Sequence, residues 1–261
     1  MASVPGENAG EDAVEAVLDR LTFDEKLTLI RGGPDPNGQA TGYIAGIDRL
    51  DIPPLRLVDG PMGIRAGVST AFPATIALGA TWDVDLARRM GSALAREARG
   101  KGQDVLLGPG LNIIRVPTAG RNFEYVSEDP LLTGTLGVGY VQGVESEGVL
   151  ATPKHYVANN QETKRSTIDV DVDDRTLREL YLEPFRRVEA NAAPGAFMAA
   201  YNRVQGTHMT AHERLLSTVL EREWTFGGFT VSDWWATHDA AGALSAGLDV
   251  EMPGVNAIEW L

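Results

Sequence analysis

The chain has 261 residues, of which 43% are hydrophobic and 23% charged, an ordinary composition for a globular protein with a sizeable core. The formal net charge of −13 argues against nucleic acid and anionic membranes as partners, because both require clustered Lys and Arg. The absence of Cys excludes disulfides, thiol nucleophiles and zinc–thiolate sites.

The N-terminal segment MASVPGENAGEDAVEAV is acidic and has no apolar region of the kind found in secretory signals. No apolar run in the sequence approaches the length of a membrane span. We therefore expect a cytoplasmic protein with a flexible N-terminus over residues 1–10. Nothing in the sequence indicates a metal, an organic cofactor or a particular oligomeric state.

Helical and strand patterns alternate along the rest of the chain. Apolar spacing over residues 14–21 predicts a helix, and the capping-box pattern of Thr22–Glu25 predicts a second one. Short apolar runs predict buried strands at 55–58, 75–78, 105–107, 149–152, 196–200, 229–231 and 248–250. Amphipathic patterns predict helices at 84–99, 131–147, 175–190 and 213–224, with Asp83 and Asp174 as N-caps.

This alternation predicts an α/β fold with a parallel sheet covered by helices, in one domain. A (β/α)8 barrel of the TIM type is the predicted architecture, and a doubly wound open sheet is the alternative. The sequence provides seven such strands, so the barrel is expected to be incomplete at its C-terminal end.

Polar and reactive side chains follow several of the predicted strands. Asp59 follows 55–58, Lys154 and His155 follow 149–152, Tyr201 follows 196–200, and Asp233 follows 229–231. The carboxyl ends of barrel strands meet at one mouth, where active sites are found. We therefore expect these residues to share one pocket.

Asp233 lies between an apolar run and two tryptophans, in TVSDWWATHDA. Taken alone, it is most simply explained as the N-cap of a helix beginning near Ala236. The alternative is a carboxylate nucleophile beside aromatic platforms. That combination suits sugars, whose C–H faces stack on Trp while their hydroxyls bind charged groups.

Lys154 and His155 are adjacent, and neighbouring side chains on a regular strand point to opposite faces. Both can reach one pocket only if the strand geometry is irregular there. Lys154 as a Schiff-base lysine is a weaker alternative to a role in hydroxyl binding. Arg121, in the aperiodic stretch GRNFE, and Arg165, in NNQETKR, are further candidates, with ordinary surface ion pairing as their alternative.

Several motifs together resemble glycoside hydrolase family 3, in its β-glucosidase branch. They are, in family order, LVDGPMGIR, GPGLNIIRVPTAGRNFEYVSEDPLLTG, KHYVANNQETKR, FMAAYNRVQG and GFTVSDWWA. The resemblance covers nearly the whole chain. It implies that residues 11–261 form the family's N-terminal (β/α) barrel domain, with the C-terminal sandwich domain absent.

The resemblance also implies the chemistry: a retaining, exo-acting β-glucosidase acting on terminal β-D-glucosyl residues. Asp233 matches the family's nucleophile, which forms a glycosyl-enzyme through an oxocarbenium-like transition state. The positions that match glycone-binding or pocket-lining residues are Asp59, Arg121, Lys154, His155, Arg165, Met198, Tyr201 and Trp234.

The general acid/base is the point of departure from the family pattern. In this branch it is a glutamate in a following domain, and the sequence ends at Leu261 before any such domain. The branch that carries a His–Asp acid/base in the barrel has a Gly-His element that KHYVANNQE lacks. We expect Glu124 and Glu162 to pair with the pocket Arg and Lys instead. A non-catalytic sugar-binding fragment, a β-xylosidase and a barrel lyase using Lys154 stay open as alternatives.

Overall fold

The structure is a computed structural model of the chain, and it describes residues 8–254. The strands are β1 (Gly32–Gly33), β2 (Gly42–Ile44), β3 (Leu55–Asp59), β4 (Val105–Leu107), β5 (Leu150–Ala151), β6 (Lys154–Tyr156), β7 (Asp169–Val170), β8 (Ala196–Ala199), β9 (Arg203–Val204), β10 (Thr207–His208) and β11 (Phe229–Ser232). Most of the flexible N-terminus expected at 1–10 lies outside the described residues.

The α-helices are α1 (Asn8–Leu18), α2 (Phe23–Leu29), α3 (Thr75–Gly79), α4 (Val84–Gly100), α5 (Pro130–Glu145), α6 (Asp174–Thr176), α7 (Glu183–Ala192) and α8 (Ala240–Ser245). Two π-helical segments, η3 (Leu177–Leu182) and η5 (Arg214–Glu223), complete the predicted helices at 175–190 and 213–224. Short 3₁₀ turns are η1 (Asp48–Leu50), η2 (Asn122–Glu124) and η4 (Met209–Ala211).

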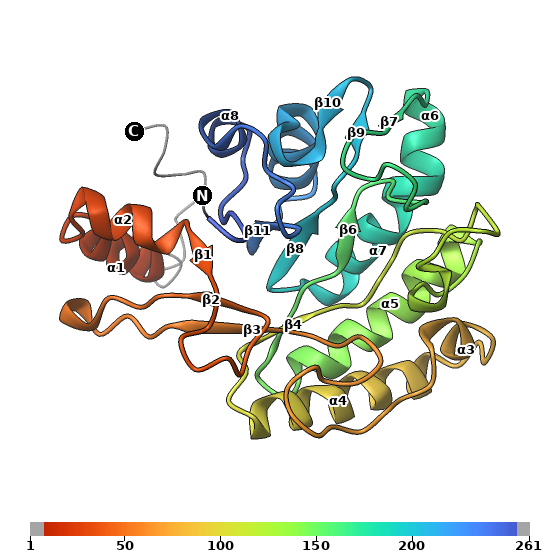
Figure 1. The fold of residues 1–261 in the computed structure, drawn as a ribbon, viewed down its shortest axis with the longest axis horizontal. Helices are drawn as coiled ribbons and strands as arrows, with labels where there is room; N and C mark the ends of the chain where they lie inside the picture. Colours follow the sequence, from red (N-terminus) through yellow and green to blue (C-terminus); the bar gives the residue numbers. More distant parts are fainter. Residues whose placement is uncertain (1–7, 255–261) are drawn as a thin grey trace, which may run out of the picture.

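Two groups of strands occupy the centre of the molecule (Figure 1). One is a five-stranded sheet in the order β1-β2-β3-β4-β5, in which β3, β4 and β5 are parallel and β1 and β2 are antiparallel additions. The other is the parallel sheet β11-β8-β6. Isolated parallel bridges connect the groups on both sides: Gly110–Lys154 on one, and Val231–Val250 with Arg31–Glu251 on the other.

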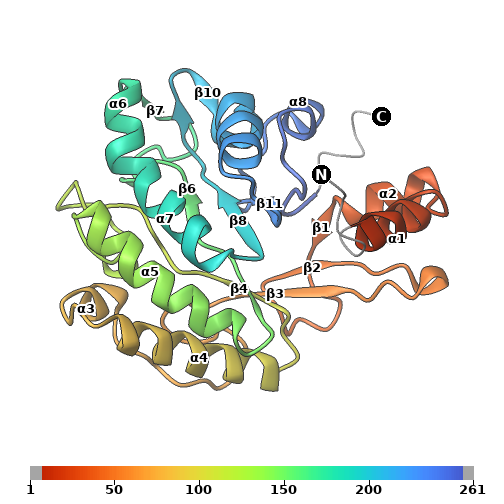
Figure 2. The same ribbon diagram turned by 180° about the vertical axis from the view of Figure 1, so that it is seen from behind.

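The predicted α/β class is therefore confirmed, with helices outside a mostly parallel set of strands (Figures 1 and 2). Within residues 8–254 the strands form no continuous closed barrel, because short bridges replace full ladders between the two groups. β7, β9 and β10 form a separate small sheet beside them.

Two predicted strands are wrong as stated. Segment 75–78 is helix α3, in which the buried residues Thr75, Leu78 and Gly79 follow helical spacing rather than strand alternation. Segment 248–250 is reduced to a single bridge from Val250 to Val231, and the next residue, Glu251, bridges to Arg31 instead.

Two local predictions need correction as well. The strand expected at 149–152 is β5, and a second short strand, β6, begins only three residues after it and carries Lys154 and His155. The helix at 174 is capped by Asp173, whose Oδ1 accepts the Thr176 N–H at 3.0 Å. Adjacent aspartates compete for a cap, and sequence alone does not decide between them. Asp83 does cap α4, as predicted.

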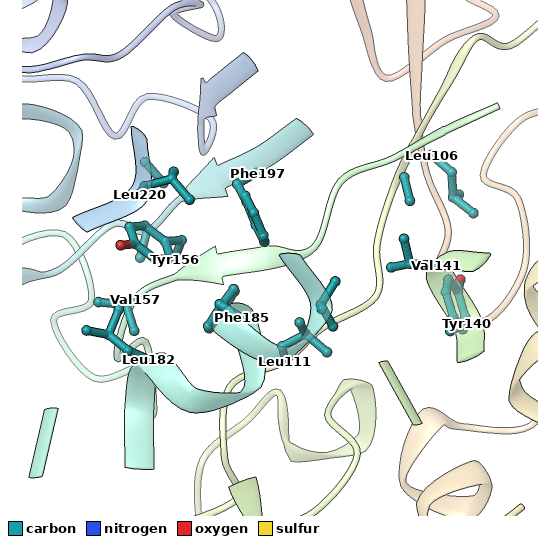
Figure 3. Close-up of a cluster of buried hydrophobic side chains, with 14 of the residues drawn as sticks. Leu106, Leu111, Tyr140, Val141, Tyr156, Val157, Leu182, Phe185, Phe197 and Leu220 are labelled. Atoms are coloured by element: carbon teal, nitrogen blue, oxygen red, sulfur yellow. The ribbon is translucent and has the colours of Figure 1, made fainter. Parts of the chain in front are cut away.

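The main apolar core lies between the strands and the helices. Helix α4 packs along α5, and α5 along α7 (Figure 2). Helices α4 and α5 approach closely because Gly91 and Gly143 have no side chain. A Cβ on Gly91 would lie 2.2 Å from Tyr140 O, and one on Gly143 would lie 2.0 Å from Arg88 O. Figure 3 shows the centre of this core around Tyr156, Phe185 and Phe197.

A smaller apolar cluster lies on the other face of the same strands. It contains Leu57, Leu107, Met198 and Val231, with Trp234 packed against it. Neighbouring residues alternate between the two clusters, as Phe197 and Met198 do on β8. The strands are thus buried on both faces, and the inner cluster forms the floor of a cavity.

Candidate active site

A cavity of about 370 Å³ opens above the inner cluster, at the carboxyl ends of β3, β4, β8 and β11 and beside the first residues of β6. All the candidates that the sequence predicted lie on its wall: Asp59, Arg121, Lys154, His155, Arg165, Met198, Tyr201, Asp233 and Trp234. The structure therefore brings residues from distant parts of the sequence together, while their individual roles stay predictions.

Lys154 is the central cation of the cavity and is only 3% exposed. Its Nζ lies 2.8 Å from Asp59 Oδ1 and 3.2 Å from Glu124 Oε1. Burial would lower the pKa of Lys154, but the two carboxylates outweigh it and raise the pKa above its usual value. Burial would likewise raise the pKa of Asp59 and Glu124, and the Lys154 charge lowers both instead.

Asp59 ends β3, and two further contacts hold it at the mouth. Its backbone N–H donates to Thr41 Oγ1 at 2.9 Å, and its Oδ2 pairs with the Arg65 guanidinium at 2.9 Å. One carboxylate oxygen thus faces Lys154 and the other faces Arg65. Both oxygens already accept from cations, so Asp59 is an ionised acceptor suited to binding hydroxyl groups.

The two predicted arginines are held by glutamates, as expected. Arg121 donates from Nε and Nη2 to the two carboxylate oxygens of Glu124, at 2.8 and 2.9 Å. Arg165 donates to Glu162 at 2.8 Å, and its guanidinium carbon lies 4.1 Å from the ring centroid of Tyr201. The predicted pairing of Glu124 and Glu162 with pocket cations is confirmed.

Asp233 follows directly after β11 and is 7% exposed. Its Oδ1 accepts the Trp234 N–H at 2.8 Å, and its Oδ2 lies 3.4 Å from His155 Nε2. The next α-helix in the described chain, α8, is capped by Asp239, so the cap interpretation of Asp233 is wrong. Burial raises the pKa of Asp233, while the charges of Arg121 and Lys154 act in the opposite direction.

His155 is fully buried between Asp233 and the loop after β4. Burial, together with the positive charges of Arg121 and Lys154, holds its pKa well below the usual value. The pairing of β6 with β8 changes register between Lys154 and Tyr156. This irregularity is the departure from strand geometry that the sequence required, and both Lys154 and His155 line the cavity.

Aromatic rings border the cavity on the side of Asp233. Trp234 can lie over β2 because Gly42 has no side chain: a Cβ there would come within 2.8 Å of its ring. Trp235 is 67% exposed and lies outside the cavity lining. Of the two tryptophans, Trp234 is therefore the one placed to stack against a bound ring.

Sequence reasoning missed some residues of the cavity wall, namely Thr41, Arg65, Leu107 and Phe123. Arg65 stands in the quoted motif LVDGPMGIR, six residues after Asp59, so a signal for it was present. Thr41 precedes β2 and carries no local pattern that connects it with Asp59.

The described residues contain no group of three or more His, Asp or Glu side chains arranged to hold a metal ion. The same part of the chain also has no helix with the length and apolar character needed to cross a membrane.

Residues 44–259 match the family described as the Glycosyl hydrolase family 3 N terminal domain, and the chain belongs to this family. A beta-glucosidase from Rhizobium radiobacter is 45% identical over 92% of this chain. Beta-glucosidase B from Emericella nidulans is 46% identical over 92%. Beta-glucosidase 3B from Thermotoga neapolitana, solved with glycerol, superposes with a TM-score of 0.91 at 41% identity over 95% of this chain.

The chain spans less than a third of the two curated relatives, 30% and 28% of their lengths, and 37% of the solved Thermotoga chain. The predicted family and barrel-type fold are thereby confirmed.

Proposed function

We propose that this chain provides the glycone site and the nucleophile of a retaining, exo-acting β-glucosidase. The observation that supports the proposal is the position of Asp233, a buried carboxylate in the same cavity as the charged cluster of Asp59, Arg121 and Lys154. Sugar hydroxyls are bound by such charged donors and acceptors, and Trp234 offers an apolar face for the ring. The relatives named above are beta-glucosidases, and one Thermotoga structure contains alpha-D-glucose.

In the proposed reaction Asp233 attacks the anomeric carbon of a terminal β-D-glucosyl unit, and the aglycone oxygen leaves. Water then opens the glycosyl–Asp233 ester, which gives net retention. The positive charges of Arg121 and Lys154 favour the ionised, nucleophilic form of Asp233 against the effect of burial.

Retaining hydrolysis also requires a carboxylic acid that protonates the leaving group, with a pKa raised toward neutrality. The Lys154 charge lowers the pKa of both Asp59 and Glu124, so these carboxyls are ionised at neutral pH and unsuited to that role. Apart from Asp233 they are the carboxyls in the lining of the described cavity, so we assign the acid/base to a carboxyl outside residues 8–254.

The main competing chemistry, a lyase with a Schiff base at Lys154, needs a neutral amine as nucleophile. The raised pKa of Lys154 keeps its amine protonated. A β-xylosidase and a non-catalytic sugar-binding unit use the same cavity, and they are separated from the proposal by the experiment below.

The test is covalent trapping with a 2-deoxy-2-fluoro-glucoside that bears an activated leaving group, which reduces the need for an acid. We expect the intact-mass increase of one fluoroglucosyl group, and peptide mapping should place it on Asp233. The Asp233→Asn variant should take up no label, and Asp51→Asn, at an exposed position outside the cavity lining, should label like the unmodified chain.

A folded chain labelled at another carboxyl would overturn the assignment of Asp233. Faster labelling by the corresponding fluoroxyloside would favour the xylosidase. Binding of glucose without any labelling would favour the non-catalytic alternative, and borohydride trapping of an aldehyde substrate at Lys154 would favour the lyase.

A further inference from the structure

Asn112 is a buried residue of the loop after β4 that holds the backbone of His155 from two directions. Its Nδ2 donates to His155 O at 2.9 Å, and its Oδ1 accepts the His155 N–H at 2.8 Å. Exchanging the amide oxygen and nitrogen would set two donors against each other and two acceptors against each other. The backbone of His155 therefore determines which side-chain atom of Asn112 is the oxygen.

The same oxygen lies 3.2 Å from Nδ1 of the His155 ring. Because Asn112 Oδ1 can only accept, Nδ1 must carry a proton to make this contact favourable. The hydroxyl of Tyr125 is 3.5 Å from Nδ1 and donates to Asn159 O at 3.3 Å, so it also accepts readily from Nδ1. Both neighbours of Nδ1 thus favour the same tautomer.

We infer that Asn112 is a positioning residue that holds His155 in the Nδ1–H tautomer, so that His155 Nε2 presents a lone pair to Asp233 Oδ2 and the two groups take up one proton as a unit. Its bearing on catalysis rests on the proposed function, in which Asp233 is the nucleophile. The tautomer itself rests only on the contacts of Asn112.

The contact between Nε2 and Oδ2, at 3.4 Å, explains why the proton is shared. With both groups deprotonated, a lone pair faces a carboxylate, which is unfavourable in a buried site. One proton, on Oδ2 or on Nε2, converts this contact into a hydrogen bond. Such a pair titrates with a joint pKa rather than as two independent groups.

The surrounding charges act on this shared proton. Arg121, Lys154 and Arg165 disfavour a positive charge on His155, and Tyr125 contacts its other nitrogen. Burial raises the pKa of Asp233, against the charges of Arg121 and Lys154 and the hydrogen bonds from the Trp234 N–H and the Tyr201 hydroxyl, which all lower it. When the pair holds a proton, the carboxyl therefore carries most of it, and Asp233 becomes a nucleophile as the proton leaves the pair.

The first test is the nitrogen NMR spectrum of the chain with ¹⁵N-labelled histidine. The sequence has only four histidines, so the His155→Gln variant assigns the His155 signals. We expect the pattern of an Nδ1–H imidazole, with Nε2 unprotonated or hydrogen-bonded to the carboxyl. A neutral Nε2–H pattern in the unmodified chain would overturn the inference, and this measurement needs no variant of Asn112.

The second test asks whether the oxygen of Asn112 fixes the tautomer of His155 by accepting a hydrogen bond, or whether the packing of the Asn112 side chain is sufficient. Asn112→Asp keeps an oxygen for Nδ1 and should retain the Nδ1–H pattern, whereas Asn112→Leu removes it and should allow the Nε2–H tautomer. Asn160→Ala is the matched control, because Asn160 Nδ2 donates to Ile113 O in the same segment without contacting His155. The inference is wrong if Asn112→Leu keeps the Nδ1–H pattern or if Asn160→Ala loses it.

The third test follows the carboxyl carbon of Asp233 through a pH titration, assigned with Asp233→Asn. In Asn112→Leu the Nε2–H can donate to the carboxylate, so the Asp233 midpoint should move to lower pH by about one to two units. An unchanged midpoint would contradict the shared proton. None of these measurements requires turnover, so their outcome does not depend on whether the fluoroglucoside labels Asp233.

Discussion

The main apolar core between the strands and the helices, called the outer core below, and the cavity at the strand ends bury opposite kinds of side chain. On β6, Tyr156 turns into the outer core, where its ring meets Phe185 at 5.4 Å between centroids and its hydroxyl donates to Leu215 O at 2.8 Å (Figure 3). The preceding residues of the same strand, Lys154 and His155, turn into the cavity. The outer core gains free energy from apolar burial, while the cavity loses it by desolvating charges.

Apolar burial in the outer core offsets the free energy that burying charges in the cavity costs. Buried charges persist only when partners compensate them, as Lys154 is compensated by Asp59 and Glu124. Among the described residues Asp233 has no Lys or Arg within ion-pair distance; its Oδ2 faces a neutral imidazole nitrogen, and the Tyr201 hydroxyl donates a hydrogen bond to its carboxylate. Removing the charge of Asp233 should therefore stabilise the fold, whereas removing a core ring or the cation Lys154 should destabilise it.

The largest expected loss of stability comes from the outer core. Phe185→Ala removes a fully buried ring that packs against Tyr156 and Phe197, and it should lower the free energy of unfolding by roughly 3–5 kcal/mol. Urea denaturation followed by circular dichroism measures this change. The control is Phe23→Ala, at a position 64% exposed, which should change stability by less than about 0.5 kcal/mol. Equal losses in both variants would show that this core does not support the fold.

Breaking the charged cluster should cost slightly less. Lys154→Met leaves Asp59 and Glu124 without their shared cation. We expect the free energy of unfolding to fall by about 3 kcal/mol at neutral pH, which is at the low end of the cost of breaking a buried ion pair. The loss is limited because Arg65 and Arg121 still pair with these carboxylates. The exposed Lys26→Met is the control.

The pH dependence of that loss has a definite sign. Lys154 lowers the pKa of Asp59 and Glu124 in the folded chain, so their contribution to stability is present above the unfolded pKa, near 4, and is lost as pH falls through the folded pKa. The deficit of Lys154→Met should therefore be largest at neutral pH and shrink in acid. A deficit that grows in acid would show that the pairing does not stabilise the fold.

Much of the architecture follows from local patterns in the sequence. The apolar runs at 55–58, 105–107 and 229–231 predicted strands because their side chains are buried on both faces, and polar residues after them predicted the mouth of the cavity. The run at 75–78 failed because four apolar residues fit a helix turn as well as a strand. β6 was missed because Lys154 and His155 are polar and resemble a loop.

The side-chain network of the site was less accessible to prediction. The role of Asn112 depends on the backbone of His155, which is 43 residues away in the chain and adjacent only after folding. Thr41 and Asp59 meet in the same way. Residue type and spacing indicated which groups carry chemistry, but the contacts that orient them arise from tertiary packing.

The smallest expected change in stability is a gain, from removing the charge of Asp233. Asp233→Asn keeps the shape of the side chain and its acceptor for the Trp234 N–H, and removes the buried charge. At neutral pH we expect the variant to be more stable than the unmodified chain by about 0.5–2 kcal/mol, the usual range where a functional group is destabilising. The measurement is urea denaturation at several pH values, with Asp51→Asn as the control.

The pH dependence of this gain follows from the raised pKa of Asp233 in the folded chain. A raised pKa contributes stability below the unfolded pKa, near 4, and that contribution is lost as pH rises through the folded pKa. The advantage of Asp233→Asn should therefore appear as pH rises and vanish in acid, where Asp233 is protonated in both states. If the variant is less stable than the unmodified chain at neutral pH, the attraction of Arg121 and Lys154 for the carboxylate exceeds the cost of burying its charge. The charged groups of the cavity would then stabilise the fold, as the apolar residues of the outer core do.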